Sequence, residues 1–202
     1  MPSADPGAPI VRPADVERWL ADLGLEPVDR AERDGIASWD LVLDGRRRFD
    51  LRVTVILDPS MALICWAHYA PPINDMFRKS YRRLLHWNDE FPFAKFSVGE
   101  DERPLLAVET PIDIATAAGV DVLGTSLVRI VGIADRLLDE SKDWIWLGGR
   151  MPDQSGRMCR NEDLIARYED RLPELYAEGP EPDAPDAATE APDAAPAVVA
   201  KV

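Results

Sequence analysis

The sequence predicts an α+β domain built on a mainly antiparallel five-stranded sheet, with flanking helices and a C-terminal helical extension. Three observations support this fold class. Apolar and polar residues alternate in several segments, which is the period of a strand. Other segments carry apolar residues with the 3.6-residue period of a helix, and these segments interrupt the strands. Turn signals join neighbouring strands directly, which favours hairpins over a doubly wound parallel sheet.

The predicted domain begins with a helix. Pro13 suits the first helical position, and Gly24 suits the end of the helix. Four apolar residues share one face at helical spacing, namely Val16, Trp19, Leu20 and Leu23. We expect this face to pack against a core.

Three strands are predicted between residues 39 and 69. Apolar residues alternate from Trp39 to Leu43, and Asp44-Gly45 is a typical residue pair of a tight hairpin. Alternation resumes from Phe49 to Leu57, as in an antiparallel strand with one solvated face. Residues 61–69 are apolar at almost every position. That strand is either central in the sheet, with something over its second face, or its second face meets a partner.

A second helix should follow Pro71-Pro72, with Asn74 as its cap. Its apolar stripe comprises Phe77, Tyr81, Leu84, Leu85 and Trp87. We interpret Asn88 to Glu90 as the frayed end of the helix, and Pro92 favours an extended conformation at Phe91, where the next strand should begin. The segment "RRLLHWNDEFPFAKF", residues 82–96, is therefore predicted to be a structural junction and not an active site.

Two further strands and a long helix complete the domain. Ala94, Phe96 and Val98 share one face of the first strand, "GEDER" forms a solvated turn, and residues 104–110 return. The long helix starts between Asp113 and Gly119 and keeps its apolar period to Leu138. Gly132 lies inside it, which indicates either a close backbone approach to another helix or a tolerated cost of about 1 kcal/mol relative to alanine.

The C-terminal extension is predicted to be a loop followed by a helix. Trp144 and Trp146 anchor the loop, and Asn161 caps the helix. The apolar residues of this helix are Leu164, Ile165, Tyr168 and Leu172, and Pro173 interrupts it. The chain thus divides into a disordered N-terminus (1–12), an α+β domain (13–142), the extension (143–177) and a disordered acidic Pro/Ala/Asp tail (178–202).

Composition and charge argue against nucleic acid and membranes as partners. The net charge of −14 makes nucleic acid an unlikely main partner, because binding phosphates needs an excess of lysine and arginine. Two basic clusters, 46–48 and 78–83, leave a nucleic-acid reading as the lowest-ranked alternative. No apolar run approaches the ~20 residues of a membrane span, so we expect a protein without membrane contact. Two cysteines in a chain of 202 residues favour a reducing cytoplasm.

No arrangement of residues predicts a reaction, a metal or a cofactor. Nucleotide-binding glycine loops, hydrolase nucleophile motifs and paired metal-ligand spacings are absent from the sequence. His68 and His86 are interpreted as packed or surface residues. Cys65 is interpreted as a small buried apolar residue, and Cys159 could be mildly reactive because Arg157 and Arg160 flank it. We therefore predict no catalytic residues.

Two groups of residues are candidates for binding. Ile64, Trp66 and His68 lie on the second face of the apolar strand, and surplus aromatic residues are preferred anchors at protein interfaces. Burial of Trp66 under the C-terminal extension is the equally weighted alternative. Arg150, Arg157 and Arg160 form a second group that could clamp a phosphate or carboxylate. The simpler interpretation is that these arginines pair with acids of the last helix.

The element order and the segment "LLHWNDEFPFAKFSVGEDERPLLAVETPI" make the chain resemble the bacterial YbjN-like family over about residues 14–142. The most specific motif comprises Leu84, Leu85, Trp87, Asn88, Phe91, Pro92, Phe93, Ala94, Lys95 and Phe96. The resemblance implies a compact fold similar to that of class I type III secretion chaperones, often dimeric, which binds peptides or partner proteins. It implies no catalytic residues, and the family label is "sensory transduction regulator".

These observations favour a non-enzymatic protein-interaction module, chaperone-like or regulatory. Its partner is a protein or peptide, and a second copy of the chain, in a homodimer, is among the candidates. The alternative is a small-molecule or anion-binding protein, or an uncharacterised enzyme, that uses a cleft near the C-terminal extension.

Overall fold

The computed structural model describes residues 11–68, 78–100, 103–145, 154 and 156–177. These residues form an antiparallel six-stranded sheet in the order β1-β2-β3-β4-β6-β5. The strands are β1 (Asp29–Arg33), β2 (Ile36–Leu43), β3 (Leu51–Asp58), β4 (Ala62–His68), β5 (Lys95–Val98) and β6 (Pro104–Pro111). The helices are α1 (Pro13–Asp22), α2 (Arg78–Glu90), α3 (Ile112–Ala118), α4 (Val120–Arg136), α5 (Leu138–Ile145), α6 (Glu162–Tyr168) and α7 (Pro173–Tyr176), with a 3₁₀ turn at Glu169–Arg171.

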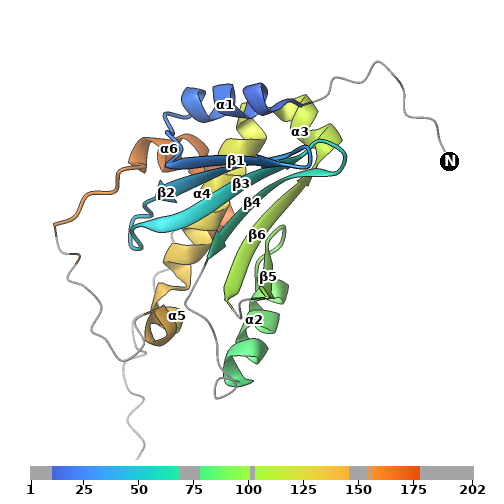
Figure 1. The fold of residues 1–202 in the computed structure, drawn as a ribbon. Helices are drawn as coiled ribbons and strands as arrows, with labels where there is room; N and C mark the ends of the chain where they lie inside the picture. Colours follow the sequence, from blue (N-terminus) through green and yellow to red (C-terminus); the bar gives the residue numbers. More distant parts are fainter. Residues whose placement is uncertain (1–10, 69–77, 101–102, 146–153, 155, 178–202) are drawn as a thin grey trace, which may run out of the picture.

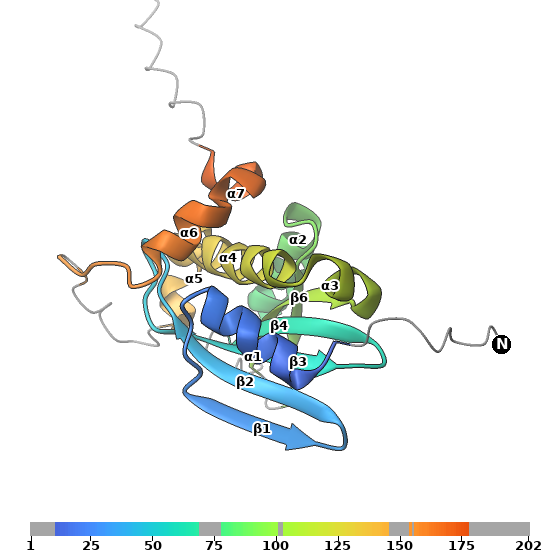
Figure 2. The same cartoon turned by 90° about the horizontal axis from the view of Figure 1, so that it is seen from above.

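The helices α1, α3, α4, α6 and α7 lie on the same side of the curved sheet (Figures 1 and 2). We call the side that faces them the core face and the opposite side the outer face. The α+β class is confirmed, with one strand more than the five predicted. Several predicted features, such as the Asn74 cap, the loop anchor Trp146, and the ends of the chain (1–10 and 178–202), lie outside the described residues.

The core lies between the sheet and α4, as the hydrophobic patterns predicted. Val16, Trp19, Leu20 and Leu23 of the first helical stripe are all buried. Along α4, apolar side chains at helical spacing are at most 2% exposed, namely Leu123, Leu127, Ile130, Val131 and Ala134. Burial of each leucine, isoleucine or valine in this set contributes about 1.5–3 kcal/mol. β4 lies inside the sheet, between β3 and β6, as one of the two alternatives considered for residues 61–69 requires.

The strand missing from the prediction is β1. All five of its residues, "DRAER", are exposed, so it has no apolar alternation that could reveal it. A tight turn joins it to β2, since both Asp34 and Gly35 have positive φ angles, of 55° and 81°. This left-handed pair matches the twist of a two-residue hairpin.

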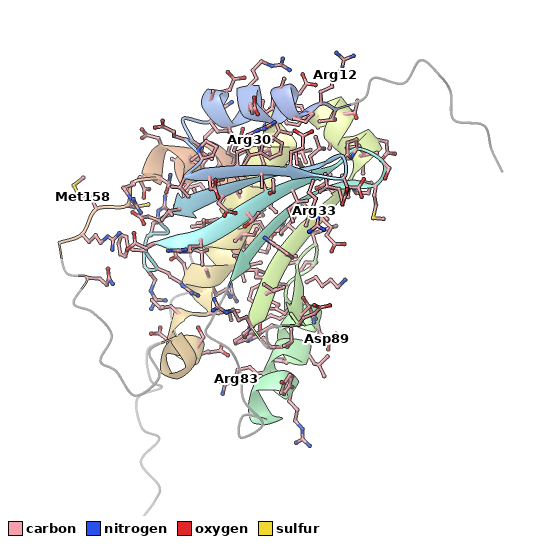
Figure 3. The ribbon with its side chains drawn as sticks, viewed as in Figure 1. Arg12, Arg30, Arg33, Arg83, Asp89 and Met158 are labelled. Atoms are coloured by element: carbon pink, nitrogen blue, oxygen red, sulfur yellow. The ribbon has the colours of Figure 1, made fainter. Side chains whose placement is uncertain are left out.

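Charged side chains protect β1 as an edge of the sheet. Arg30 donates hydrogen bonds to Glu17 of α1 at 2.7 Å and to Glu32 at 3.2 Å. Figure 3 shows Arg30 and Arg33 along this exposed strand. Charges on an edge strand discourage pairing with another chain. This edge is therefore a poor place for a further strand to add.

The link between β2 and β3 differs from the predicted two-residue hairpin. It is a loop of residues 44–50, in which Asp50 adopts a positive φ of 56° and the positive-φ glycines do not include Gly45. Phe49 precedes β3, and the guanidinium of Arg157 lies over its ring, 4.6 Å from the ring centroid. The loop departs from a tight turn because side chains far along the sequence hold its backbone.

The junction between α2 and β5 is structural, but two details of its prediction were wrong. Leu84 and Trp87 are buried, whereas Leu85 is 66% exposed and Tyr81 is 37% exposed, so the apolar stripe is narrower than predicted. The strand begins at Lys95 and not at Phe91, because residues 91–93 form a turn in which Phe93 has a φ of 64°.

Asn88 is not a fraying residue. The helix continues to Glu90, and the Asn88 side chain makes both backbone hydrogen bonds of a strand partner. Its Oδ1 accepts the Phe96 N–H at 2.6 Å, and its Nδ2 donates to the Phe96 carbonyl at 2.9 Å. One amide group thereby fixes the start of β5 relative to α2.

The predicted single long helix is three helices in the structure. It bends by 111° between α3 and α4, at Gly119, whose φ is 52°. A second break at Leu137 separates α4 from α5, and the predicted loop residue Trp144 lies in α5. Glycine suits the first break because L side chains rarely adopt a positive φ.

Two glycines of α4 provide contact points for the C-terminal helices. A Cβ atom at Gly124 would lie 2.4 Å from the Tyr168 ring, and one at Gly132 would lie 2.7 Å from the Tyr176 hydroxyl. The Tyr176 hydroxyl donates a hydrogen bond to the Val128 carbonyl at 3.1 Å. The close approach considered for Gly132 is thus made by a tyrosine side chain and not by another helix backbone.

Candidate interaction surface

The outer face of the sheet carries the predicted partner-binding residues. On β4, Leu63, Cys65 and Ala67 point into the core, so Ile64 and Trp66 point to the outer face, where both are partly buried. His68 is the last residue of β4, and its side chain lies outside what the structure describes. The period of two residues in a strand is therefore sufficient to place Ile64 and Trp66 on one face.

Strand pairing extends the group into an apolar strip. Ile64 lies between Ile56 of β3 and Glu109 of β6, and Trp66 lies between Thr54 and Ala107. The apolar members of the strip are Val42, Ile56, Ile64, Trp66, Leu105 and Ala107, which we call the outer-face strip. Leu105 and Ala107 are less than 10% exposed, and the other four are partly buried.

Polar groups border the outer-face strip. Thr54 donates a hydrogen bond from Oγ1 to Asp40 Oδ1 at 2.7 Å, and Lys95 Nζ lies 4.0 Å from Glu109 Oε1. Beside the strip is a hollow of about 420 Å³ lined by Val28, Asp40, Leu41, Val42, Arg52, Val53, Thr54 and Arg103. An apolar centre with a polar rim is the typical anatomy of a protein interface.

Residues 156–177, which we call the C-terminal clasp, do not cover this strip. Leu164, Ile165, Tyr168 and Leu172 of the clasp are buried in the main core. In Figure 2, α6 and α7 lie next to α4, on the side of the sheet away from the outer face. Within the described residues, the clasp therefore packs on the core side of the sheet and not over the outer-face strip.

Ion pairs fasten the clasp to the β2–β3 loop. Arg160 donates to both oxygens of Asp44, at 2.7 and 2.8 Å, and Arg157 donates to both oxygens of Asp50, each at 2.7 Å. Asp44 also receives support at its backbone, where its N–H donates to Asn161 Oδ1 at 2.7 Å. Bidentate arginine–carboxylate pairs are the stronger and more specific kind of ion pair.

In the predicted anion clamp, the two arginines that the structure describes already pair with these carboxylates. Arg157 and Arg160 form a balanced group with Asp44 and Asp50, and Arg150 lies outside the described residues. Their partners belong to the β2–β3 loop and not to the last helix, so the pairing considered from the sequence was wrong in its location. The anion site stays a prediction, and the geometry favours a structural role for Arg157 and Arg160.

The role predicted for Asn161 also changes. It occupies the cap position of α6, but its side chain makes no capping hydrogen bond. Its carbonyl oxygen instead accepts the N–H of Asp44, 117 residues earlier in the chain. Asn161 thus ties the start of α6 to the β2–β3 loop.

A buried carboxylate on α4 organises the same loop. Asp135 accepts three backbone N–H groups, from Arg46 at 2.7 Å, Arg47 at 3.0 Å and Arg48 at 2.7 Å. Burial is the largest influence on its pKa and raises it, although the three N–H groups act in the opposite direction. The only sequence signal for this role is an acid within an otherwise apolar helical face.

The carboxyl of Asp44 has a strongly lowered pKa. Burial alone would raise it, but hydrogen bonds from Arg160 and from the Asp50 N–H lower the pKa of Asp44 to about 2. The ordinary value is 3.8, so the ionised form stabilises the folded state above pH 4. That stabilisation is lost as the pH falls through about 2, where the folded carboxyl becomes protonated.

We expect Asp44→Asn to remove this acid-sensitive part of the stability. The variant should be less stable than the wild type at pH 5, and the difference should shrink by about 1–2 kcal/mol on lowering the pH to about 2. Urea unfolding at several pH values measures this difference. A gap between the two proteins that is independent of pH would contradict the assignment.

Among the side chains that the structure describes, those of the two cysteines and of His86 form no arrangement for chemistry. Burial raises the pKa of Cys65 to about 12. Burial also raises the pKa of Cys159, whose thiol donates to the Asp44 carbonyl at 3.3 Å, so the mild reactivity considered for it is not supported. His86 is exposed on α2. In the described part of the chain, no group of three or more His, Cys, Asp or Glu residues could hold a metal ion.

Comparisons with known proteins identify one family. The model of the YbjN family, described as "Putative bacterial sensory transduction regulator", matches residues 12–145, which is more than half of the chain. No curated protein matches the chain. Among the described residues, no single helix is long and apolar enough to cross a membrane, and the bent pair α3–α4 passes by length and composition only.

Proposed function

The chain belongs to the YbjN family, and on this premise we propose that it is a non-enzymatic protein-interaction module, chaperone-like or regulatory, which binds a partner protein or peptide through its outer-face strip. The family description fits a regulatory or protein-interaction role. The proposal includes a second copy of the chain as a partner, because a homodimer would bury the same strip. It places the protein in the cytoplasm, in keeping with two free cysteines.

The contrast between the two faces of β4 carries this proposal. The core face has helices packed on it, while Ile64 and Trp66 form an apolar strip on the face opposite those helices. A few side chains near the centre of an interface supply most of its binding free energy, and tryptophan is enriched among them. A protein partner supplies the large apolar surface that such a strip needs, and the proposal requires no cofactor or metal.

Ile64→Arg should abolish binding without unfolding the protein, because a charge at the centre of an apolar interface loses its hydration on binding. Tagged wild-type protein should retain a specific partner, or show a dimer by light scattering, and Ile64→Arg should lose either property. Met61→Arg is the matched control, since Met61 precedes the same strand and is 67% exposed. A monomeric wild type that retains nothing, or two variants that behave alike, would contradict the proposal.

A further inference from the structure

Part of β6 has no neighbouring strand on its outer edge among the described residues. β4 pairs with β6 from Leu105 to Pro111, whereas β5 pairs with β6 only from Pro104 to Ala107. In the part of the chain that the structure describes, residues 108–111 of β6 therefore have a strand on one side only. We call this segment the open edge. Four of the five residues of β1 are charged, whereas Glu109 is the only charged residue of the open edge.

The direction of the backbone groups along β6 follows from two hydrogen bonds. The Ile112 N–H donates to the Met61 carbonyl at 3.0 Å, next to β4, and the Arg103 carbonyl accepts the Gly99 N–H at 2.9 Å, next to β5. In an antiparallel ladder, successive residues point their backbone groups to opposite sides. Even-numbered residues thus face β4, and the N–H and C=O of Glu109 face the open edge.

The chain before β5 does not complete the pairing. Extending the register from Lys95 and Ala107 would place Phe93 opposite Glu109. Phe93 instead has a φ of 64°, and its side chain is 80% exposed, with the Arg129 guanidinium 5.4 Å from its ring. The left-handed residue directs the chain away and leaves room for another strand beside Glu109.

An apolar groove of about 460 Å³ runs along the open edge. Its lining comes from the edge itself, from α3 and α4, and from Phe93, and includes Val108, Ile114, Ala118, Val122 and Thr125. Ile114 is 51% exposed, which is high for an isoleucine. A free strand edge beside apolar pockets is the arrangement by which domains bind an extended peptide as an added strand.

We propose that residues 197–202 of the same chain, Ala-Val-Val-Ala-Lys-Val, bind in this groove as an added strand beside Glu109. Valine favours strands, and this segment carries the only valines after the clasp. Residues 178–196 contain proline, alanine, glycine, threonine and acids, and no large apolar residue. Lys201 is the only cation in residues 178–202, and the charged residues of the lining are two acids, Glu109 and Asp121, and two arginines, Arg129 and Arg171.

The clasp delivers the chain next to the groove. Arg171 and Arg129 line the groove, and Arg129 forms an ion pair with Glu174 of α7, three residues before Ala177. The link from 178 to 196 could span about 60 Å if extended, far more than this placement requires. A short tether gives an effective concentration of about 1 mM, so a groove with a Kd of about 100 µM would be filled about nine-tenths of the time.

Hydrogen exchange of the Glu109 amide in the full chain, followed by NMR, tests this proposal. Thr110 is an internal control, because its N–H faces β4 and stays bonded in every variant. Successive side chains of a strand point to opposite faces, so the double variant Val198→Asp and Val199→Asp puts one acid toward the groove. We expect Glu109 to exchange about tenfold faster in this variant, and likewise in Ile114→Asp. The control pair Ala187→Asp and Ala188→Asp should leave the rate unchanged.

Three outcomes would overturn the proposal. The first is a Glu109 exchange rate that is equal in the wild type and in the Val198/Val199 variant. The second is a control pair that changes the Glu109 exchange rate as much as the Val198/Val199 variant does. The third is protection of the Glu109 amide that falls when the protein is diluted. The last outcome would assign the strand to a second copy of the chain. Ile56→Arg, an outer-face variant on β3 that does not pair with Glu109, should not alter the Glu109 rate, so failure of this proposal is distinguishable from failure of the proposed function.

Discussion

Trp87→Ala should lower the free energy of unfolding by about 3–5 kcal/mol, because it removes a large fully buried side chain and leaves a cavity. Trp87 is 0% exposed, and its ring centroid lies 5.2 Å from that of Phe96. Its Nε1 donates to Glu140 of α5 at 3.3 Å, so one side chain joins α2, β5 and α5. Urea unfolding of the two proteins measures the difference.

Leu85→Ala on the same helix is the matched control, since Leu85 is 66% exposed. Its effect should stay within about 0.5 kcal/mol, the usual range for surface positions. A change near zero for Trp87→Ala would contradict the structural interpretation of residues 82–96 and would restore the case for a direct role of this motif in binding.

Asp135→Ala should lower the free energy of unfolding by about 2–4 kcal/mol. The alanine would leave the N–H groups of Arg46, Arg47 and Arg48 without the acceptor that each now has. A buried donor without a partner costs about 1–3 kcal/mol, and relaxation of the loop toward water would recover part of the sum. Thermal or urea unfolding measures the loss.

Asp135→Asn should lower the free energy of unfolding less than Asp135→Ala does, because the amide retains one oxygen that can accept a hydrogen bond. The difference between the two variants isolates hydrogen bonding from packing. If Asp135→Ala were as stable as the wild type, the β2–β3 loop would be held by other contacts, and Asp135 would have no organising role.

The periodic elements could be predicted because their side chains alternate between the core and water. The stripe of α1, the central position of β4 and the apolar face of α4 follow from local patterns. The two members of the predicted interaction surface whose side chains are described, Ile64 and Trp66, lie together because strand alternation is also local.

The remaining features depend on contacts between distant residues. β1 has no apolar residue except Ala31, so only its pairing with β2 defines it. The β2–β3 loop takes its shape from Asp135 and Asn161, roughly 90 and 117 residues away in sequence. The open edge exists because β5 is four residues shorter than β6, and a single sequence does not reveal such a difference in length.

Site-specific photo-crosslinking from the outer face tests the central claim most directly. A photoreactive phenylalanine analogue at Ile64, in living bacteria that express the full chain, should capture one defined protein, either a partner or a second copy. The same analogue at Leu85, an exposed position on α2, should capture none. Capture at Leu85 with none at Ile64, or no defined product at either position, would contradict partner binding through the outer face.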